Sequence, residues 1–376
     1  MTSRADGCCQ ATLSATHTRD AFVVQAGAPS LVALVSSEQA AIADASAGAA
    51  AAAARQHESA KVALFGAGAM PALLKCIKRH ESSAPAVAAA ASALFRLATP
   101  DDPRVAASCA FAHGRALATA GGITALLLAL RAHPEDAARG PLLCALRCAA
   151  VNDDACALAA DGGAVIVGVA ALRSGGPLVL PALALLRQLA GCDVVKPLLL
   201  SAGGLPPLLD TLRCAAETPK AAGSARTAEA GLALLSALSL RTADCVAAIA
   251  AGGAIDVAAT AMEAFPACGP VQRAACMFFR NVAARNQELR GPMSDRGLEA
   301  LLRAAKHAHP SLCVDVGSAA LRDLGCDAYN EGWNPTTVYM GDSGQLLTYD
   351  ELDGADGNGR QEEEGGRCAS LSVVSE

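Results

Sequence analysis

Four arginines stand near the ends of four of six aligned apolar stretches of the chain: Arg147, Arg187, Arg280 and Arg322. A guanidinium group offers its N–H donors in a planar fork, which suits bidentate contact with carboxylates or phosphates. If the apolar stretches are stacked helices, the four side chains form a column along one edge of a groove. The same pattern fits a structural role, in which each arginine pairs with an acidic or carbonyl group of the adjacent unit. The sequence leaves both readings open.

The elements that position these arginines belong to a repeating unit marked by glycine. Its copies lie at Gly27-Ala28, Gly68-Ala69, Gly121-Gly122, Gly162-Gly163, Gly203-Gly204, Gly252-Gly253 and Arg296-Gly297. The steps between them are 41, 53, 41, 41, 49 and 44 residues. A period near 41 residues predicts stacked repeats, each of which buries its apolar face only against its neighbours.

Each unit has the pattern of three helices. A short helix ends at glycine, a second helix carries proline in its first turn at Pro29, Pro71 and Pro206, and a longer third helix follows. Proline is tolerated there because the backbone N–H at that place has no intrahelical partner. Glycine ahead of it lets the chain bend sharply without a Cβ clash.

The clearest unit predicts helices over Val194–Ala202, Leu205–Ala215 and Ala225–Ser239. The two longest steps are explained by inserted loops over residues 100–113 and 217–224. Insertion between helices leaves the core of a solenoid intact.

The whole chain divides into four predicted segments. Residues 1–18 lack periodicity and are predicted to be disordered, and residues 19–325 form about seven repeats. Residues 326–349 hold Tyr329, Trp333, Tyr339 and Tyr349, which we interpret as a cap over the last repeat or, alternatively, as a docking motif. Residues 350–376 carry 8 acidic and 2 basic residues, which predicts a disordered tail that keeps the protein soluble or folds back onto the arginine column.

Composition narrows the class of protein. Hydrophobic residues make up 53% and aromatics only 3%, so Ala, Leu, Val and Cys must fill the interior. The 15 cysteines are an odd number at apolar helical positions, which favours free thiols in a reducing compartment. No apolar run approaches the ~20 residues of a spanning helix, and the start of the chain lacks a secretory signal. We expect the cytoplasm, with the nucleus as an alternative and a weak organelle transit peptide as a less favoured one.

The three-helix pattern with glycines before the second helix resembles the armadillo repeat over about four-fifths of the chain. The resemblance implies an all-α, right-handed α-solenoid of about seven three-helix repeats that binds extended peptides in a groove lined by the third helices. Peptide-binding members carry an Asn near the end of each third helix and a Trp one turn earlier. The matching Asn positions are Arg96, Cys148, Gln188, Ala237, Asn281 and Asp323, and the Trp positions are Ser92, Cys144, Ala184, Ala233, Met277 and Ala319.

Only Asn281 keeps the family residue, which argues against recognition of basic localisation signals. The arginine column lies one position earlier, where Phe95 and Ser236 stand in the other two of the six aligned repeats. The candidate groove residues are therefore Arg147, Arg187, Gln188, Arg280, Asn281 and Arg322. Two further stretches, residues 280–283 and the final repeat over 313–326, resemble one particular family member.

The sequence predicts a non-catalytic scaffold or adaptor, monomeric, with no cofactor or metal. Its expected partner is a protein, in particular an acidic or extended peptide. A transport receptor or a chaperone-like assembly factor is the alternative. No phosphate-binding loop or nucleophile motif is present, and Cys144 with Cys148, or His307 and His309 with Cys313, give at most an incomplete metal site. The balanced charge of residues 1–349 disfavours nucleic acid.

Overall fold

The computed structural model describes residues 27–100, 108–134, 137–331, 339–340 and 346–347. The chain divides into two units, residues 1–331 and 332–376. In the second unit the described residues form two short antiparallel strands, β1 (Tyr339–Met340) and β2 (Leu346–Leu347). The predicted disordered segment 1–18, the acidic tail, Trp333 and Tyr349 lie outside the described residues.

The described part of the first unit is an α-solenoid of seven repeats, the first of them described from its second helix onward. The first helices are α5 (Glu58–Gly66), α8 (Ala110–Thr119), α11 (Asp153–Asp161), α14 (Val195–Ser201), α17 (Ala243–Ala251) and α20 (Arg290–Asp295). The second helices are α3 (Ala28–Val35), α6 (Ala69–Arg79), α9 (Gly122–Ala132), α12 (Ala164–Ser174), α15 (Leu205–Glu217), α18 (Ala254–Ala264) and α21 (Leu298–Ala308). The third helices are α4 (Ala40–Ala54), α7 (Ala84–Leu97), α10 (Arg139–Ala149), α13 (Val179–Leu189), α16 (Ser224–Leu238), α19 (Gly269–Arg285) and α22 (Pro310–Leu324). Two 3₁₀ turns, η2 (Gly176–Leu178) and η3 (Gln287–Leu289), complete the described helical elements.

The glycine pair makes the bend between the first and second helices. In four repeats these helices meet at 71–75°. One glycine of each pair takes a positive φ, +76° at Gly121 for example, which L side chains adopt only at a cost. The other allows close packing, because a Cβ on Gly122 would come within 2.6 Å of the Leu117 side chain. The two glycines therefore have different roles.

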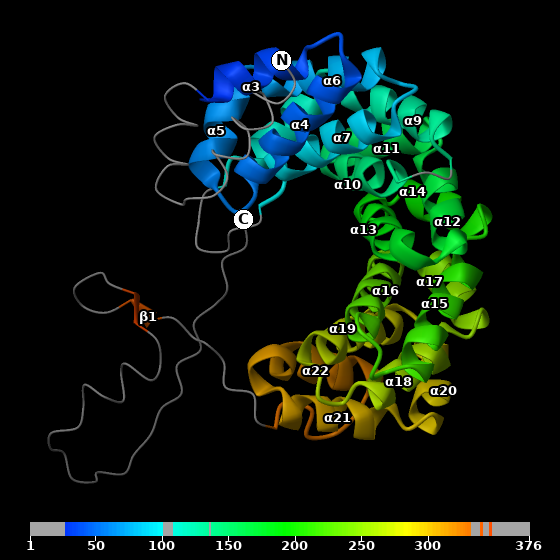
Figure 1. The fold of residues 1–376 in the computed structure, drawn as a ribbon. Coiled ribbons are helices and arrows are strands. Elements are labelled where there is room, and N and C mark those ends of the chain that lie inside the picture. The colour runs from blue at the N-terminus through cyan, green and yellow to red at the C-terminus, as the bar shows by residue number, and fades with distance from the viewer. Residues whose placement is uncertain (1–26, 101–107, 135–136, 332–338, 341–345, 348–376) are drawn as a thin grey trace, which may run out of the picture. The chain divides into compact units, whose positions relative to one another are not determined.

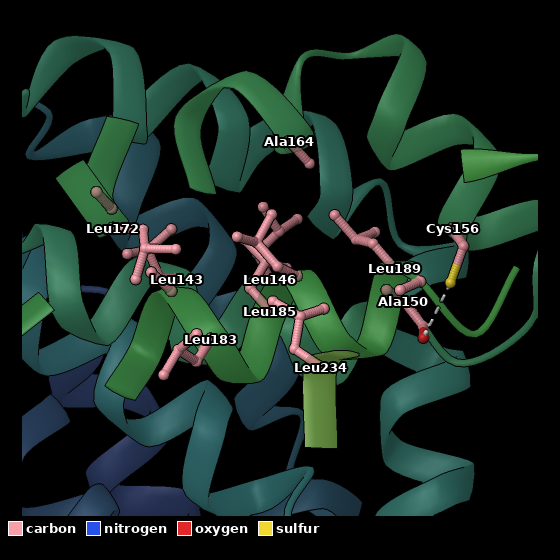
Figure 2. Packing of buried hydrophobic residues seen from close by; sticks show 14 of the residues in the cluster. Leu143, Leu146, Ala150, Cys156, Ala164, Leu172, Leu183, Leu185, Leu189 and Leu234 are labelled. Carbon is pink, nitrogen blue, oxygen red and sulfur yellow. Dashed lines mark hydrogen bonds between the residues drawn. The ribbon is translucent and has the colours of Figure 1, made fainter. Parts of the chain in front are cut away.

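The third helices pack in a row and carry the core. Each of α4, α7, α10, α13, α16 and α19 contacts the next third helix along the chain, and in the first unit these helices follow the inner side of the curved row (Figure 1). Leu143, Leu146, Leu183, Leu185 and Leu234 interlock between α10, α13 and α16 (Figure 2), and all are fully buried. We call the exposed side of this row the inner surface.

Buried lysines tie first helices to third helices. Lys61 and Lys196 have no exposed surface. Lys61 Nζ donates a 2.6 Å hydrogen bond to the Thr99 carbonyl after α7, and Lys196 Nζ bonds the Leu240 carbonyl after α16 and Asp193. Carbonyls at the end of a helix lack intrahelical donors, so each lysine caps the third helix of its own repeat.

Arginines at the ends of second helices tie one repeat to the next. Arg131 on α9 donates to the Gly162 carbonyl at 2.7 Å, and Arg173 on α12 donates to the Gly203 carbonyl at 3.0 Å. Both acceptors lie in the glycine turn of the following repeat. These hydrogen bonds are accepted by backbone carbonyls of the turn, so they require no particular side chain in the neighbouring repeat.

The predicted helices match closely in the clearest unit, where α14, α15 and α16 differ from the expected bounds by at most two residues. The 217–224 loop also lies where it was placed. The other inserted loop was predicted to run to His113, and this is wrong, since α8 already begins at Ala110. His113 lies within that helix, and its ring stacks on Phe65 of α5, with centroids 4.0 Å apart.

A helix that crosses a membrane must be both long and apolar. No single helix among the described residues is both long and apolar enough to cross a bilayer. Four first-and-second-helix pairs meet the criterion of length and composition only when the two bent helices are taken together.

Candidate partner-binding surface

The six candidate residues fall into two groups on the inner surface. Arg147, Arg187 and Gln188 lie on α10 and α13, whereas Arg280, Asn281 and Arg322 lie on α19 and α22. We call the part formed by α7, α10 and α13 the N-terminal inner surface, and the part formed by α16, α19 and α22 the C-terminal inner surface. The predicted column is thus divided between these two surfaces, and its side chains make different contacts on each.

Arg147 packs on an aromatic ring of the preceding repeat. Its guanidinium carbon lies 5.5 Å from the centre of the Phe95 ring, and that of Arg96 lies 5.0 Å from the same centre. A cation over an aromatic face gains about 0.5–1 kcal/mol at an exposed site. Phe95 therefore holds two guanidinium groups in place at the same point of the N-terminal inner surface.

A groove of about 630 Å³ extends across α7, α10 and α13. Its walls are mainly apolar and include Phe95, Pro141, Cys144, Leu178 and Pro181. Burial raises the pKa of the Cys144 thiol, so this side chain stays protonated and acts as a small apolar group. We call this the apolar groove.

A second groove of about 300 Å³ adjoins the ends of the same helices. Phe111, Arg147, Cys148 and Gln188 are among its lining residues, and the Phe111 side chain is 60% exposed. Arg147 lines this groove while its guanidinium group lies over Phe95 of the apolar groove. The two grooves are thus joined at Arg147.

The residues at the family's Asn position tie successive third helices together. Gln188 Nε2 donates a 2.7 Å hydrogen bond to the Ala150 carbonyl, and Asn281 Nδ2 donates a 2.9 Å bond to the Ser236 carbonyl. Cys148 Sγ lies 3.3 Å from Thr99 Oγ1 in the same relation. Each contact reaches the preceding repeat, so the Gln188 and Asn281 amide N–H groups are engaged within the solenoid itself.

The four arginines of the column have different partners. Arg280 Nε lies 3.9 Å from Asp323 Oδ2, and Arg322 contacts the other oxygen of that carboxylate at 2.8 Å. Arg147 stacks on Phe95 as described. Arg187 is exposed and makes no hydrogen bond or ion pair within the described part of the chain. The structural role considered from sequence, pairing with the adjacent repeat, therefore describes Arg280, whereas Arg322 pairs with its own chain neighbour on α22 and Arg187 has no such partner within the described residues.

The charge on the two inner surfaces differs accordingly. Helices α7, α10 and α13 contain Arg96, Arg139, Arg147 and Arg187 and no acidic residue. Helices α16, α19 and α22 also contain arginines, together with the acidic residues Glu229, Asp315 and Asp323. Positive charge on the N-terminal inner surface is thus not balanced by carboxylates of the helices that carry it.

Sequence reasoning missed the apolar groove. A signal was present, because Pro141 and Pro181 each precede an arginine of the column by six residues, whereas Ala274 and Val316 hold that place before Arg280 and Arg322. If these stretches are helices, the repeated spacing places each proline on the same helix as its arginine, nearly two turns earlier. The contribution of Leu178 came from the η2 turn, which no pattern predicted.

Two of the residues considered for metal binding, His309 and Cys313, pack within the solenoid. His309 Nε2 lies 2.8 Å from the Pro266 carbonyl of the preceding repeat, and Cys313 is fully buried. Among the described residues no group of three or more His, Cys, Asp or Glu side chains is arranged to hold a metal ion. Tyr329, the one residue of the predicted aromatic cap whose side chain is described, is 39% exposed, and its carbonyl accepts a 2.6 Å hydrogen bond from Lys306.

No protein-family model matches the chain, and no curated protein matches it. Solved structures do resemble it. A designed armadillo repeat protein has a TM-score of 0.54 at 18% identity, covering 68% of this chain and 100% of its own. Another, in complex with the peptide (KR)4, has 0.54 at 16%, covering 68% and 99%. A computationally designed armadillo repeat protein for modular peptide recognition has 0.53 at 18%, covering 68% and 99%. The chain therefore has an armadillo-like repeat fold.

Proposed function

We propose that this protein is a non-catalytic scaffold that binds a partner protein, through an extended segment, along the inner surface of its third helices. The observation that carries the proposal is the N-terminal inner surface, where two adjoining grooves meet at Arg147 beside the uncompensated Arg187. Exposed arginine and exposed aromatic side chains such as Phe111 are favoured at protein interfaces. An inner surface that served only to hold the stack together would not need them.

The geometry of a stacked row supports an extended ligand. Third helices packed 8–10 Å apart, an approximate spacing for helix pairs, present equivalent positions at regular steps along the row. An extended peptide, which rises about 3.3 Å per residue, can follow such a row and contact each helix in turn. Two of the similar structures are described as peptide binders, and we extend that mode of binding to this chain as part of the proposal.

Within the armadillo-like proteins, we propose that the chain is most similar to armadillo repeat-containing protein 6. The support is confined to residues 280–283, the final repeat over residues 313–326 and Trp333. This assignment adds no residue to the proposed surface, and the proposed binding mode does not depend on it.

The proposal is tested by site-specific photo-crosslinking in cells. A benzoylphenylalanine residue is placed at Ser92, which lines the apolar groove on α7, and in a matched control at Ile166, which is 62% exposed on α12. Cross-linked proteins are then identified by mass spectrometry. We expect a defined protein to be captured from Ser92 and not from Ile166. Equal capture from both positions, or none from Ser92, would contradict the proposal.

A further inference from the structure

We propose that the N-terminal inner surface selects a partner segment in which an apolar side chain lies within a few residues of two acidic side chains. The apolar side chain enters the apolar groove, and the acidic ones bind Arg147 and Arg187. This inference rests on the proposed function. It specifies the side chains that the partner presents and the repeats that bind them.

The apolar requirement follows from the walls of the groove. Pro141 on α10 and Pro181 on α13 offer side chains with no hydrogen-bonding group, and Leu178 and Cys144 lie between them. A groove with these walls gains free energy mainly by excluding water from apolar surface, about 25 cal/mol per Å² buried. A charged side chain placed between Pro141 and Pro181 would lose its hydration against walls that offer no hydrogen-bonding side chain, whereas the charged Arg96 side chain also lines the groove and could meet an acidic residue. An aliphatic or aromatic side chain is therefore the group that fits.

The acidic requirement follows from the charges around the groove. No carboxylate on α7, α10 or α13 competes for Arg147 or Arg187. Arg147 is already held against Phe95, so little of its conformational freedom remains to be lost on binding. Guanidinium and carboxylate groups match in geometry and form paired hydrogen bonds. The Arg187 side chain is exposed and has no partner within the described residues.

The spacing of the acidic residues follows from the stacking of the helices. Arg147 and Arg187 hold equivalent places on α10 and α13, which pack against each other. Neighbouring helix axes lie about 8–10 Å apart, and an extended chain rises about 3.3 Å per residue. Two acidic side chains that are two or three residues apart can therefore reach the two arginines. Closer or more distant pairs reach only one.

A basic peptide is disfavoured on the same grounds. The similar designed protein in complex with (KR)4 binds a peptide of lysine and arginine, whereas α7, α10 and α13 of this chain present arginine to the ligand. Like charges placed together in an interface repel each other and weaken binding. Single-stranded nucleic acid would satisfy the arginines through its phosphates, but its bases carry hydrogen-bonding edges that the proline and leucine walls of the apolar groove would leave unpaired. A partner protein suits both features.

The inference is tested by mRNA-display selection of random dodecapeptides on the full-length chain. We expect the enriched peptides to share one apolar residue near two Asp or Glu residues that are two or three positions apart. Their affinities are then measured by fluorescence anisotropy. A poly(U) oligonucleotide is titrated as a competing ligand, and we expect it to displace the peptides only weakly.

Matched variants assign the binding to its residues. Arg147→Glu with Arg187→Glu is expected to weaken binding by roughly tenfold or more, whereas Arg280→Glu with Arg322→Glu, at the same helix positions, changes it less than about twofold. Gly140→Leu fills the apolar groove, since a Cβ at Gly140 lies 3.8 Å from Leu178, an ordinary contact. This variant is expected to abolish binding while the melting temperature stays the same or rises.

Two results would overturn the inference while leaving the proposed function in place. One is enrichment of peptides rich in Lys or Arg, and the other is binding that depends on Arg280 and Arg322 rather than on Arg147 and Arg187. Displacement of the peptides by poly(U) at equal concentration would also overturn it in favour of nucleic acid. Failure to enrich any peptide family, together with no capture from Ser92 in cells, would overturn both the inference and the proposed function.

Discussion

The N-terminal and C-terminal inner surfaces carry arginine at the same repeat position, yet the side chains are used differently. On α19 and α22, Arg280 and Arg322 both contact Asp323. On α10 and α13, Arg147 stacks on Phe95 and Arg187 has no partner within the described residues. One carboxylate, Asp323 on α22, accounts for the difference, since it pairs with Arg322 beside it and with Arg280 of the preceding repeat. A repeated residue is therefore structural or available for binding according to what the next repeat places beside it.

The largest expected effect on stability comes from substitutions in the hydrophobic core, which lies beneath both inner surfaces. Leu186 and Leu235 are fully buried on α13 and α16. Replacement of either by Ala removes packed methyl groups and leaves a cavity, and such changes cost about 2–5 kcal/mol of unfolding free energy. Urea unfolding followed by circular dichroism measures the loss. Similar losses at both positions are expected, and a negligible loss at Leu186 would show that the core does not continue between the two surfaces.

A change at Asp323 tests the comparison itself. Asp323→Asn removes the carboxylate that Arg280 and Arg322 share, so these arginines should become available to acidic peptides. We expect the variant to bind a polyglutamate peptide weakly at a second site, without any contribution from the apolar groove, seen as a stoichiometry above one in isothermal titration calorimetry. The comparison would be wrong if the stoichiometry stayed the same while Asp323→Asn remained folded.

The side-chain amides are expected to contribute equally to stability on the two surfaces. Gln188 donates to Ala150 and Asn281 donates to Ser236, and a typical intramolecular hydrogen bond contributes about 0.5–1.5 kcal/mol. Gln188→Ala and Asn281→Ala should each lower the unfolding free energy by that amount. A loss at Asn281 much larger than at Gln188 would mean that the C-terminal inner surface depends more on its ties than the geometry indicates.

Acidic pH is expected to lower the stability of the N-terminal repeats, by less than the substitutions above. Burial lowers the pKa of His113 below its usual 6.5, so the folded state favours the neutral ring. The unfolded chain binds a proton more readily below pH 6.5, and the stability contributed by His113 is present above that pH and is lost as the pH falls towards the folded pKa. Melting temperatures measured between pH 7.5 and 5 should therefore decline.

The variant His113→Gln serves as the control, because glutamine does not titrate in this range. We expect its melting temperature to vary less with pH than that of the unchanged chain. Equal slopes for the two proteins would show that His113 does not determine the acid response.

Many of the helices could be predicted from local sequence patterns, because the glycine pair, the early proline and the apolar spacing each depend on the residues of one short stretch. Helices such as α14, α15 and α16 were predicted within two residues for this reason. Contacts between repeats were harder to predict. That Asp323 binds Arg280, or that Phe95 lies under Arg147, depends on how far one helix is rotated against the next, which the sequence of either helix does not state.

The candidate site was predicted in part for the same reason. The arginine column could be read from residue type and spacing, but the apolar groove forms from α7, α10 and the η2 turn together. Buried lysines were also missed. Lys61 and Lys196 look like surface residues until the carbonyls that they cap, at Thr99 and Leu240, are known.

The central claim is that the N-terminal inner surface is the partner-binding surface, and a crystal structure of the full-length chain with a selected peptide tests it most directly. We predict peptide density across α7, α10 and α13, with one apolar side chain between Pro141 and Pro181 and carboxylates on Arg147 and Arg187. Density over α19 and α22, or on the second helices, would contradict the claim.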